Sequence, residues 1–482
     1  MSRIHEQRHL PQRGGRSPLP RVDLTALVIP LALGASILWL LGWPAASTIA
    51  LITALVLLTA GLLTSPPAAA RGGRSTGPRD RGSSLWLMAL VMSPAILLGS
   101  AFPLVADRLA PHAVAGVRLE TLILSASVAV PWLSQVVGTP VYRLLGSTIP
   151  RGPDAVRRHY CEVWPGLLLL SIAPAMAVTA CVGIVTGWGA GALAAHFALI
   201  MAHVVFVQSL VVADLGSRRH LWALGWLAYA IALLIAPDWW LAPPLAGALS
   251  QILAIGTDLR ALARPRRFAV VPVIADMGRG LILGGVLWAD KLLLFITVGR
   301  QFDVSLVYLC LQPAVLAYSY YFAIASPRIN QAFSGFHDAL ENEPMSALHR
   351  RGAALRRMVT WSLARMASVG SAATLVVVAL TAILAPGDIA AVTAISAASL
   401  LLAILTLLAY EIDHAGDSRA ALALSGIAVV FIAASFAALG GVSAYGPIAL
   451  TAMGLSIIGA LVYHRRWSAP EYAFFWGKAL SW

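Results

Sequence analysis

Apolar runs separated by short polar stretches occupy most of this chain of 482 residues. Each run is about 20 residues long, the length of helix that crosses a bilayer core. The first two runs, 24–42 and 46–64, are separated by Gly42-Trp43-Pro44, which predicts two helices joined by a tight turn. Twelve further runs follow at 85–106, 119–142, 163–185, 190–213, 220–236, 239–257, 279–299, 304–326, 359–384, 388–410, 419–440 and 445–463. The pattern predicts an all-α polytopic membrane protein with about 14 transmembrane helices.

Arginines are concentrated in alternate loops between these runs. Examples are Arg151 with Arg157 and Arg158, then Arg264 with Arg266 and Arg267, and finally Arg465 with Arg466. The loops between them, such as TGWGAGA and GGVSAYG, carry almost no charge. Positive loops stay on the cytoplasmic side, so we expect a multi-pass protein of the inner membrane with both termini cytoplasmic. This placement explains the net charge of +13 better than nucleic-acid binding does.

The charge pattern also divides the chain into segments. We expect a disordered basic cytoplasmic tail, an extra N-terminal transmembrane hairpin, a cytoplasmic linker, two six-helix lobes separated by a cytoplasmic loop, and a cytoplasmic C-terminal tail. Their boundaries are 1–23, 24–65, 66–84, 85–257, 258–278 (the inter-lobe loop), 279–464 and 465–482. Because both lobes begin on the same side, they are candidate parallel repeats, an arrangement found in transporters.

Composition excludes several classes of protein. Hydrophobic residues make up 59% of the chain and charged residues 11%, with a mean hydropathy of +0.80, which is too apolar for a soluble enzyme with a membrane anchor. The sequence contains no phosphate-binding loop, no zinc-ligand spacing and no nucleophile elbow. We therefore expect no enzyme activity, no cofactor and no metal. His196 and His203 lie on one helix face, where hydrogen bonds between helices are favoured over a metal site.

Asp290 and Lys291 are the most unusual residues of the apolar runs. They lie in the middle of RGLILGGVLWADKLLLFITVGR (279–300), next to Trp288. On insertion scales an ionisable residue at the bilayer centre costs roughly 2.5–3.5 kcal/mol, and such residues usually face a bundle interior or a water-filled path. The functional interpretation is a polar group that lines a transport pathway. The alternative is a structural link from Asp290 to a neighbouring helix, with Lys291 reaching toward an interface.

Other polar and aromatic residues are candidates for the same pathway. Gln135 follows Pro131, which removes a backbone hydrogen bond, and Gln312 precedes Pro313. Tyr318 belongs to a tyrosine cluster whose rings can stack on sugars or simply pack, and Arg328 follows at the predicted cytoplasmic mouth. Amides within spans also join helices to one another without any role in transport.

The segment 328–345 has the pattern of an amphipathic helix. Phe333, Phe336 and Leu340 recur at helical spacing, with Asp338 and Glu341 between them. Such a helix lies on the inner membrane surface or docks a cytoplasmic partner.

Several segments together resemble a known family. WADKLLLF (288–295), QPAVLAYSYYF (312–322) and FHDALENEP (336–344) are similar to the G component of the Pel exopolysaccharide export system, as are AYEIDHAGDSRAALAL (409–424) and YGPIALTA (445–452). That family is placed in the superfamily of polysaccharide and lipid-linked oligosaccharide flippases, known as the MOP superfamily. The chain departs from the family at Ala-Ser-Pro-Arg-Ile (325–329), which lacks an acidic partner for the arginine, and around Glu411-Ile412-Asp413, interpreted here as a loop.

The resemblance implies a 12-helix, two-lobe flippase-like core with a central cavity. It also implies export of a polysaccharide or lipid-linked glycan for a biofilm matrix, beside a cytoplasmic glycosyltransferase and other synthase-complex subunits, and among membrane lipids. The cavity helices would be 85–106, 119–142, 279–299 and 304–326. Two alternatives remain: a membrane-embedded glycosyltransferase that uses Asp107 or Glu120 as base, and a non-transporting scaffold of a polysaccharide synthase.

Overall fold

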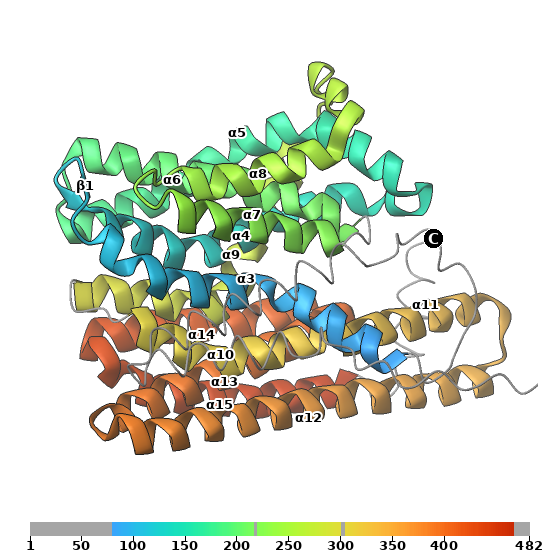
Figure 1. Ribbon diagram of the computed structural model, residues 1–482. Helices are drawn as coiled ribbons and strands as arrows, with labels where there is room; N and C mark the ends of the chain where they lie inside the picture. Colours follow the sequence, from blue (N-terminus) through green and yellow to red (C-terminus); the bar gives the residue numbers. More distant parts are fainter. Residues whose placement is uncertain (1–79, 216–218, 300–303, 467–482) are drawn as a thin grey trace, which may run out of the picture.

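The computed structural model describes residues 80–215, 219–299 and 304–466, and almost all of them are helical (Figure 1). The first helices are α3 (Asp80–Leu109), α4 (Leu119–Gly146), α5 (Pro153–Thr186), α6 (Ala190–Leu215), α7 (Arg219–Ile235) and α8 (Ala242–Ile255). The later ones are α9 (Val270–Val298), α10 (Val304–Tyr320), α11 (Ser326–Asn342), α12 (Met345–Leu384), α13 (Ile389–His414), α14 (Ser418–Leu439) and α15 (Tyr445–Arg466).

This architecture confirms the prediction of an all-α, multi-pass membrane protein. Among the described residues, nine helices are long and apolar enough to cross a membrane, and the shorter helix His220–Ile235 is also apolar. Each of the twelve runs predicted from residue 85 onward coincides with a helix. The two runs predicted at 24–42 and 46–64 lie outside the described residues.

The helices extend further than the apolar runs, mainly at their arginine-rich ends. α9 begins at Val270 rather than at 279, and α12 begins at Met345 rather than at 359. α13 continues to His414, so the interpretation of Glu411-Ile412-Asp413 as a loop is wrong. Hydropathy reports only the part of a helix that lies in lipid. The helical hydrogen bonding of the backbone continues beyond that part into the polar sequence at the helix ends.

A short β-hairpin joins α3 to α4 at the end opposite to the arginine-rich loops. Ala113–Val114 pairs with Val117–Arg118 in antiparallel register. The two residues of the turn, Ala115 and Gly116, have φ angles of 50° and 84°. Positive φ at both turn positions is what the tightest hairpins require, and Gly116 adopts it without a steric cost.

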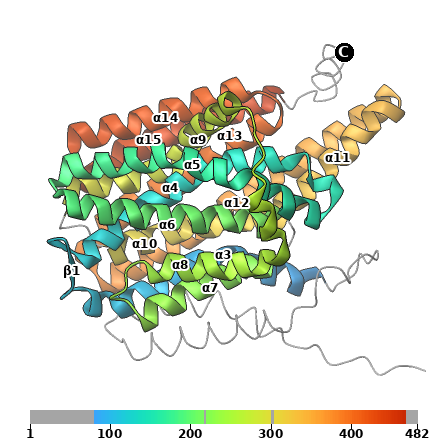
Figure 2. The ribbon, with the colours of Figure 1, turned by 90° about the horizontal axis from the view of Figure 1, so that it is seen from above.

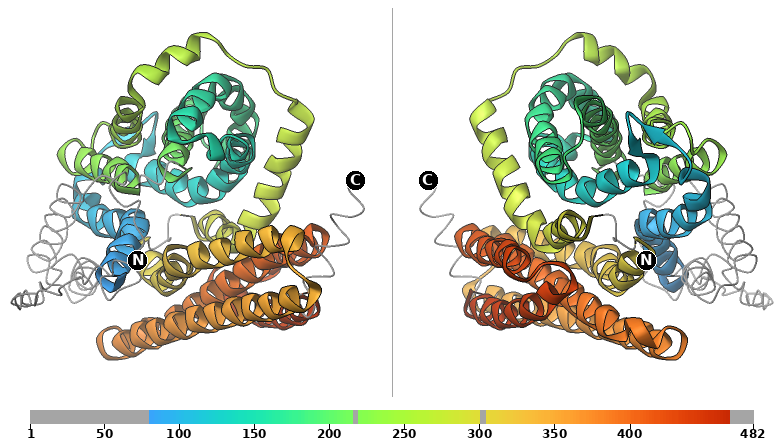
Figure 3. Two further views of the ribbon diagram at one scale, coloured as in Figure 1. Left: turned by 90° about the vertical axis from the view of Figure 1, so that its right-hand side faces the viewer. Right: turned by 90° about the vertical axis from the view of Figure 1, so that its left-hand side faces the viewer.

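The helices form two groups that lie side by side. Seen along the helices, Figure 3 shows the blue-to-green helices α3 to α8 on one side and the orange and red helices α12 to α15 on the other. The groups meet where α4 packs along α9 and where α3 packs against α10. α9 also packs against α13 and α14, so this helix belongs to the second group and contacts the first along its length.

α11 and the first part of α12 extend beyond the other helices, at the end opposite to the β-hairpin (Figure 1 and Figure 2). Phe336 is buried, with 1% of its surface exposed, Leu340 is half-buried, and Phe333 packs on His414 with ring centroids 4.5 Å apart. The prediction that these side chains meet the membrane surface or a partner is therefore wrong for Phe336. Sequence periodicity reports an apolar face but not what covers it, and here the chain itself covers that face.

Candidate functional site in the second helix group

Asp290 and Lys291 lie inside the second helix group, not on its surface. Their side chains are 0% and 3% exposed. Lys291 Nζ donates to Asp290 Oδ2 at 2.5 Å and to Ser399 Oγ of α13 at 2.9 Å. The ammonium group is thus held between its own helix and α13 and does not extend toward an interface.

The other oxygen of the carboxylate is less well satisfied. Tyr445, at the start of α15, lies beside Asp290, and its hydroxyl is fully buried. However, Asp290 Oδ1 and the Tyr445 hydroxyl have no hydrogen-bond partner within the described part of the chain. An incompletely satisfied ionic group in an apolar interior is costly and is weak evidence of a purely stabilising role.

Gln135 and Trp132 of α4 lie on the seam between the two helix groups. A Cβ atom added to Gly280 would lie 2.2 Å from the Gln135 carbonyl oxygen, and one added to Gly284 would lie 2.6 Å from Gln135 Cβ. Trp132 Nε1 donates to the carbonyl oxygen of Leu281 at 2.8 Å. The Gly280-x-x-x-Gly284 spacing therefore lets the two backbones approach closely, as small residues do in membrane helix pairs.

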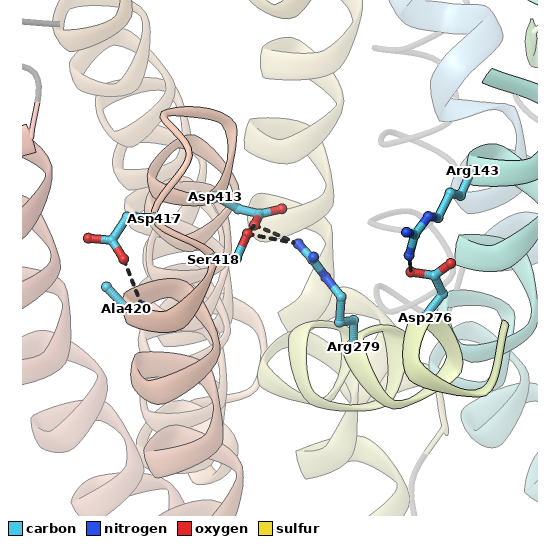
Figure 4. A network of polar contacts seen from close by, with 7 residues as sticks. All are labelled: Arg143, Asp276, Arg279, Asp413, Asp417, Ser418 and Ala420. Atoms are coloured by element: carbon cyan, nitrogen blue, oxygen red, sulfur yellow. Dashed lines mark hydrogen bonds and ion pairs between the residues drawn. The ribbon is translucent and has the colours of Figure 1, made fainter. Parts of the chain in front are cut away.

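Two ion pairs of α9 continue this seam toward the arginine-rich end (Figure 4). Arg143 of α4 pairs with Asp276 of α9 at 2.7 Å, and Asp276 is only 6% exposed. Three residues from Asp276, Arg279 pairs with Asp413 of α13 at 2.5 Å, and Asp413 also accepts from Ser418. α9 is thereby bound to the first helix group on one face and to α13 on another.

The remaining predicted pathway residues do not join the Asp290–Lys291 pair. Trp288 is half-buried against the apolar cluster of Leu287 and Leu311, and Gln312 is 8% exposed. Tyr318 packs on Phe322 with ring centroids 4.6 Å apart, and Arg328 is exposed. Among the described residues, Asp290 and Lys291 are the only two of the predicted pathway residues that are joined by a side-chain hydrogen bond.

A second buried acid, which sequence reasoning missed, lies near the arginine-rich end of the same group. Glu411 of α13 is fully buried, and its Oε1 accepts a hydrogen bond from the hydroxyl of Tyr321. Tyr321 begins a π-helical turn, Tyr321–Ala325, between α10 and α11. The signal that could have revealed this site is an acid directly after an apolar run, followed three residues later by His414.

The first helix group has a polar interior of a different kind. His203 Nε2 lies 3.0 Å from the Tyr229 hydroxyl and Nδ1 lies 2.8 Å from the Leu199 carbonyl oxygen. His196 Nδ1 lies 3.1 Å from the Thr179 hydroxyl. These contacts support the interpretation of both histidines as hydrogen-bonded bundle residues. No group of three or more potential metal ligands occurs among residues 80–215, 219–299 and 304–466.

No protein-family model matches the chain, and no curated protein matches it. Among solved structures, the chain is similar to an outward-facing multidrug resistance MATE family transporter of the MOP superfamily, at 15% identity and a TM-score of 0.40 over 93% of this chain and 96% of that one. It is also similar to a MOP superfamily transporter from Pyrococcus furiosus, at 14% identity and a TM-score of 0.42 over 93% and 96%. A MATE structure in complex with MaL6 matches at 13% identity and a TM-score of 0.42 over 93% and 97%. Similarities at this level assign neither a family nor a substrate to the chain.

Proposed function

We propose that this chain is a transporter of the inner membrane that moves a polysaccharide or lipid-linked glycan outward, beside a cytoplasmic glycosyltransferase. The observation that carries the proposal is the Asp290–Lys291 pair, buried in a span-length apolar helix. Ionisable residues within membrane helices are expensive and mark transport paths by default. A helix that needed only to span and pack would place apolar residues there.

The arrangement of α9 supports a role for this pair in a conformational change. α9 carries the pair on its side toward α13 and contacts the first helix group through Gly280 and Gly284. A movement of the first group against α9 therefore reaches the helix that holds the buried charges. In this conformation the pair is closed off from solvent, and we propose that transport exposes it in turn to either side.

The proposed substrate class rests on sequence. One of the segments that resemble the Pel export component, 288–295, includes Asp290 and Lys291, and the basic loops favour a cytoplasmic position for the arginine-rich helix ends. A glycan that emerges from a cytoplasmic synthase would meet the protein at those ends.

The test uses a double variant, Asp290→Asn with Lys291→Met, expressed in the native host. The two neutral side chains have similar volumes and leave no buried charge without a partner, so we expect normal membrane abundance. Surface polysaccharide should fall while intracellular polysaccharide rises. Normal export at equal abundance would make the pair a structural link and would remove the main support for the proposal.

A further inference from the structure

We propose that Glu411, together with Tyr321 and His414, forms a proton-binding site through which proton movement is coupled to transport. The coupling rests on the proposed function, whereas the proton site itself does not. The three residues come from the end of α13 and from the π-helical turn that links α10 to α11.

Within the described part of the chain, no arginine or lysine lies at ion-pair distance from the buried Glu411 carboxyl group, and His414 is its one candidate cation. The Glu411 side chain is 1% exposed, and Tyr321 donates to Oε1. Oε2 has no hydrogen-bond partner among the described residues. His414 Nδ1 stands 4.0 Å from Oε2, beyond hydrogen-bond distance. A carboxylate left in this state would be costly, and binding a proton removes that cost.

The other titratable and charged groups that face the site do not supply a buried cation at hydrogen-bond distance. Tyr410 precedes Glu411 on α13, and Tyr463 of α15 faces the acid from the opposite helix. Asp413 adds a second negative charge near Tyr410, but it pairs with Arg279. Arg356 of α12 lies beside Tyr463.

Asp290 provides the contrast within the same helix group. Its carboxylate has a resident cation in Lys291, at 2.5 Å, and so it does not require a proton for neutrality. Among the described residues, no cation lies at hydrogen-bond distance from Glu411. This difference assigns the proton site to Glu411 rather than to Asp290.

His414 provides the route between the acid and water. Its side chain is 24% exposed, in contrast to 1% for Glu411. In the exchange step, the O–H bond of the acid breaks as its proton passes to imidazole Nδ1, and the imidazolium then releases its Nε2 proton to water. The electron pair of the broken bond remains on the carboxylate oxygen.

The π-helical turn gives the site a link to conformational change. Tyr321–Ala325 interrupts the regular hydrogen bonding between α10 and α11, and such turns occur frequently at functional sites. Because Tyr321 is the first residue of the turn, a return to α-helical geometry would move its hydroxyl relative to Glu411 Oε1. Protonation of Glu411 and the register of this turn are therefore coupled.

The site can be tested without substrate by infrared difference spectroscopy on the full chain in lipid nanodiscs. We expect a carbonyl stretch of a protonated carboxylic acid whose intensity changes with pH. It should be lost in Glu411→Gln, which keeps an acceptor for Tyr321, and retained in the double variant Asp290→Asn with Lys291→Met, which leaves no buried charge without a partner. In Tyr321→Phe the band should shift to higher frequency, because its carbonyl oxygen loses a hydrogen bond. In His414→Gln, hydrogen–deuterium exchange of the band should slow by about 100-fold.

Absence of a pH-dependent carboxylic acid band, or its persistence in Glu411→Gln, would overturn the proton site. If the wild-type protein transports a glycan but shows no such band, the proton site is rejected and the proposed function stands. A titrating Glu411 band in a protein that moves no glycan under any gradient would instead reject the proposed function and leave the proton site in place.

Discussion

Lys291 shows how a residue's chemistry depends on one distant contact. Consecutive helical positions point in different directions, and the long lysine stem is what lets Nζ reach both its neighbour Asp290 and Ser399, which is 108 positions away. The two charges are buried together, so each one depends on the other for its stability.

This dependence predicts strong coupling between the two positions. Lys291→Met alone should lower the free energy of unfolding by about 3–5 kcal/mol, because it leaves a buried carboxylate without its cation. Adding Asp290→Asn should recover most of that loss. Thermal unfolding of the purified variants in one detergent measures both effects. Additive losses in the double variant would show that the pair is not an energetic unit.

At the scale of helices, the contact between α4 and α9 depends on glycine. Gly280→Ala would place a methyl group against the Gln135 backbone, so we expect a loss of about 1–3 kcal/mol from over-packing. Gly278→Ala, two positions earlier on the same helix, is the matched control because nothing lies within 4 Å of its added Cβ. Thermal unfolding should therefore separate the two variants. Equal behaviour would mean that the close approach contributes nothing to stability.

The α11–α12 extension makes a second prediction at this scale. Phe336→Ala should destabilise the protein by about 3–5 kcal/mol, because it removes a fully buried aromatic side chain. Gln331→Ala, at an exposed position of the same helix, should have little effect. Limited proteolysis between α11 and α12 measures the difference. Resistance of Phe336→Ala equal to wild type would show that the buried Phe336 ring contributes little to the stability of the α11–α12 extension.

At the scale of the whole molecule, Arg143–Asp276 joins the two helix groups at their arginine-rich ends. If the two helix groups separate at this end during transport, a covalent link between them must stop transport. Arg143→Cys with Asp276→Cys, in a background without Cys161, Cys181 and Cys310, should lose transport when treated with a bifunctional thiosulfonate and recover when the link is reduced. Each single cysteine variant, treated in the same way, controls for modification. Full transport by the cross-linked protein would show that this end of the seam stays closed.

Much of the element scale was predictable because membrane insertion imposes a length. Apolar runs of about 20 residues must become helices to satisfy their backbone in lipid, and the helices from α3 to α15, except the amphipathic α11, follow them. The ends of the helices were not predictable in this way: α12 begins within polar sequence, and α13 includes Glu411. Of the candidate site, the sequence identified Asp290 and Lys291 as exceptional but not Ser399 or Tyr445 as their neighbours.

The sequence by itself determined which segments are helical and how charge is distributed between their two ends, because both follow from local hydropathy. Only the tertiary structure decided which polar groups meet. Arg143 and Asp276 are separated by 133 positions, and Tyr321 and Glu411 by 90. The period of a helix fixes the face on which a residue lies, but not which other helix packs against that face. That choice depends on the fit of small and large side chains between helices, as Gly280 and Gln135 show.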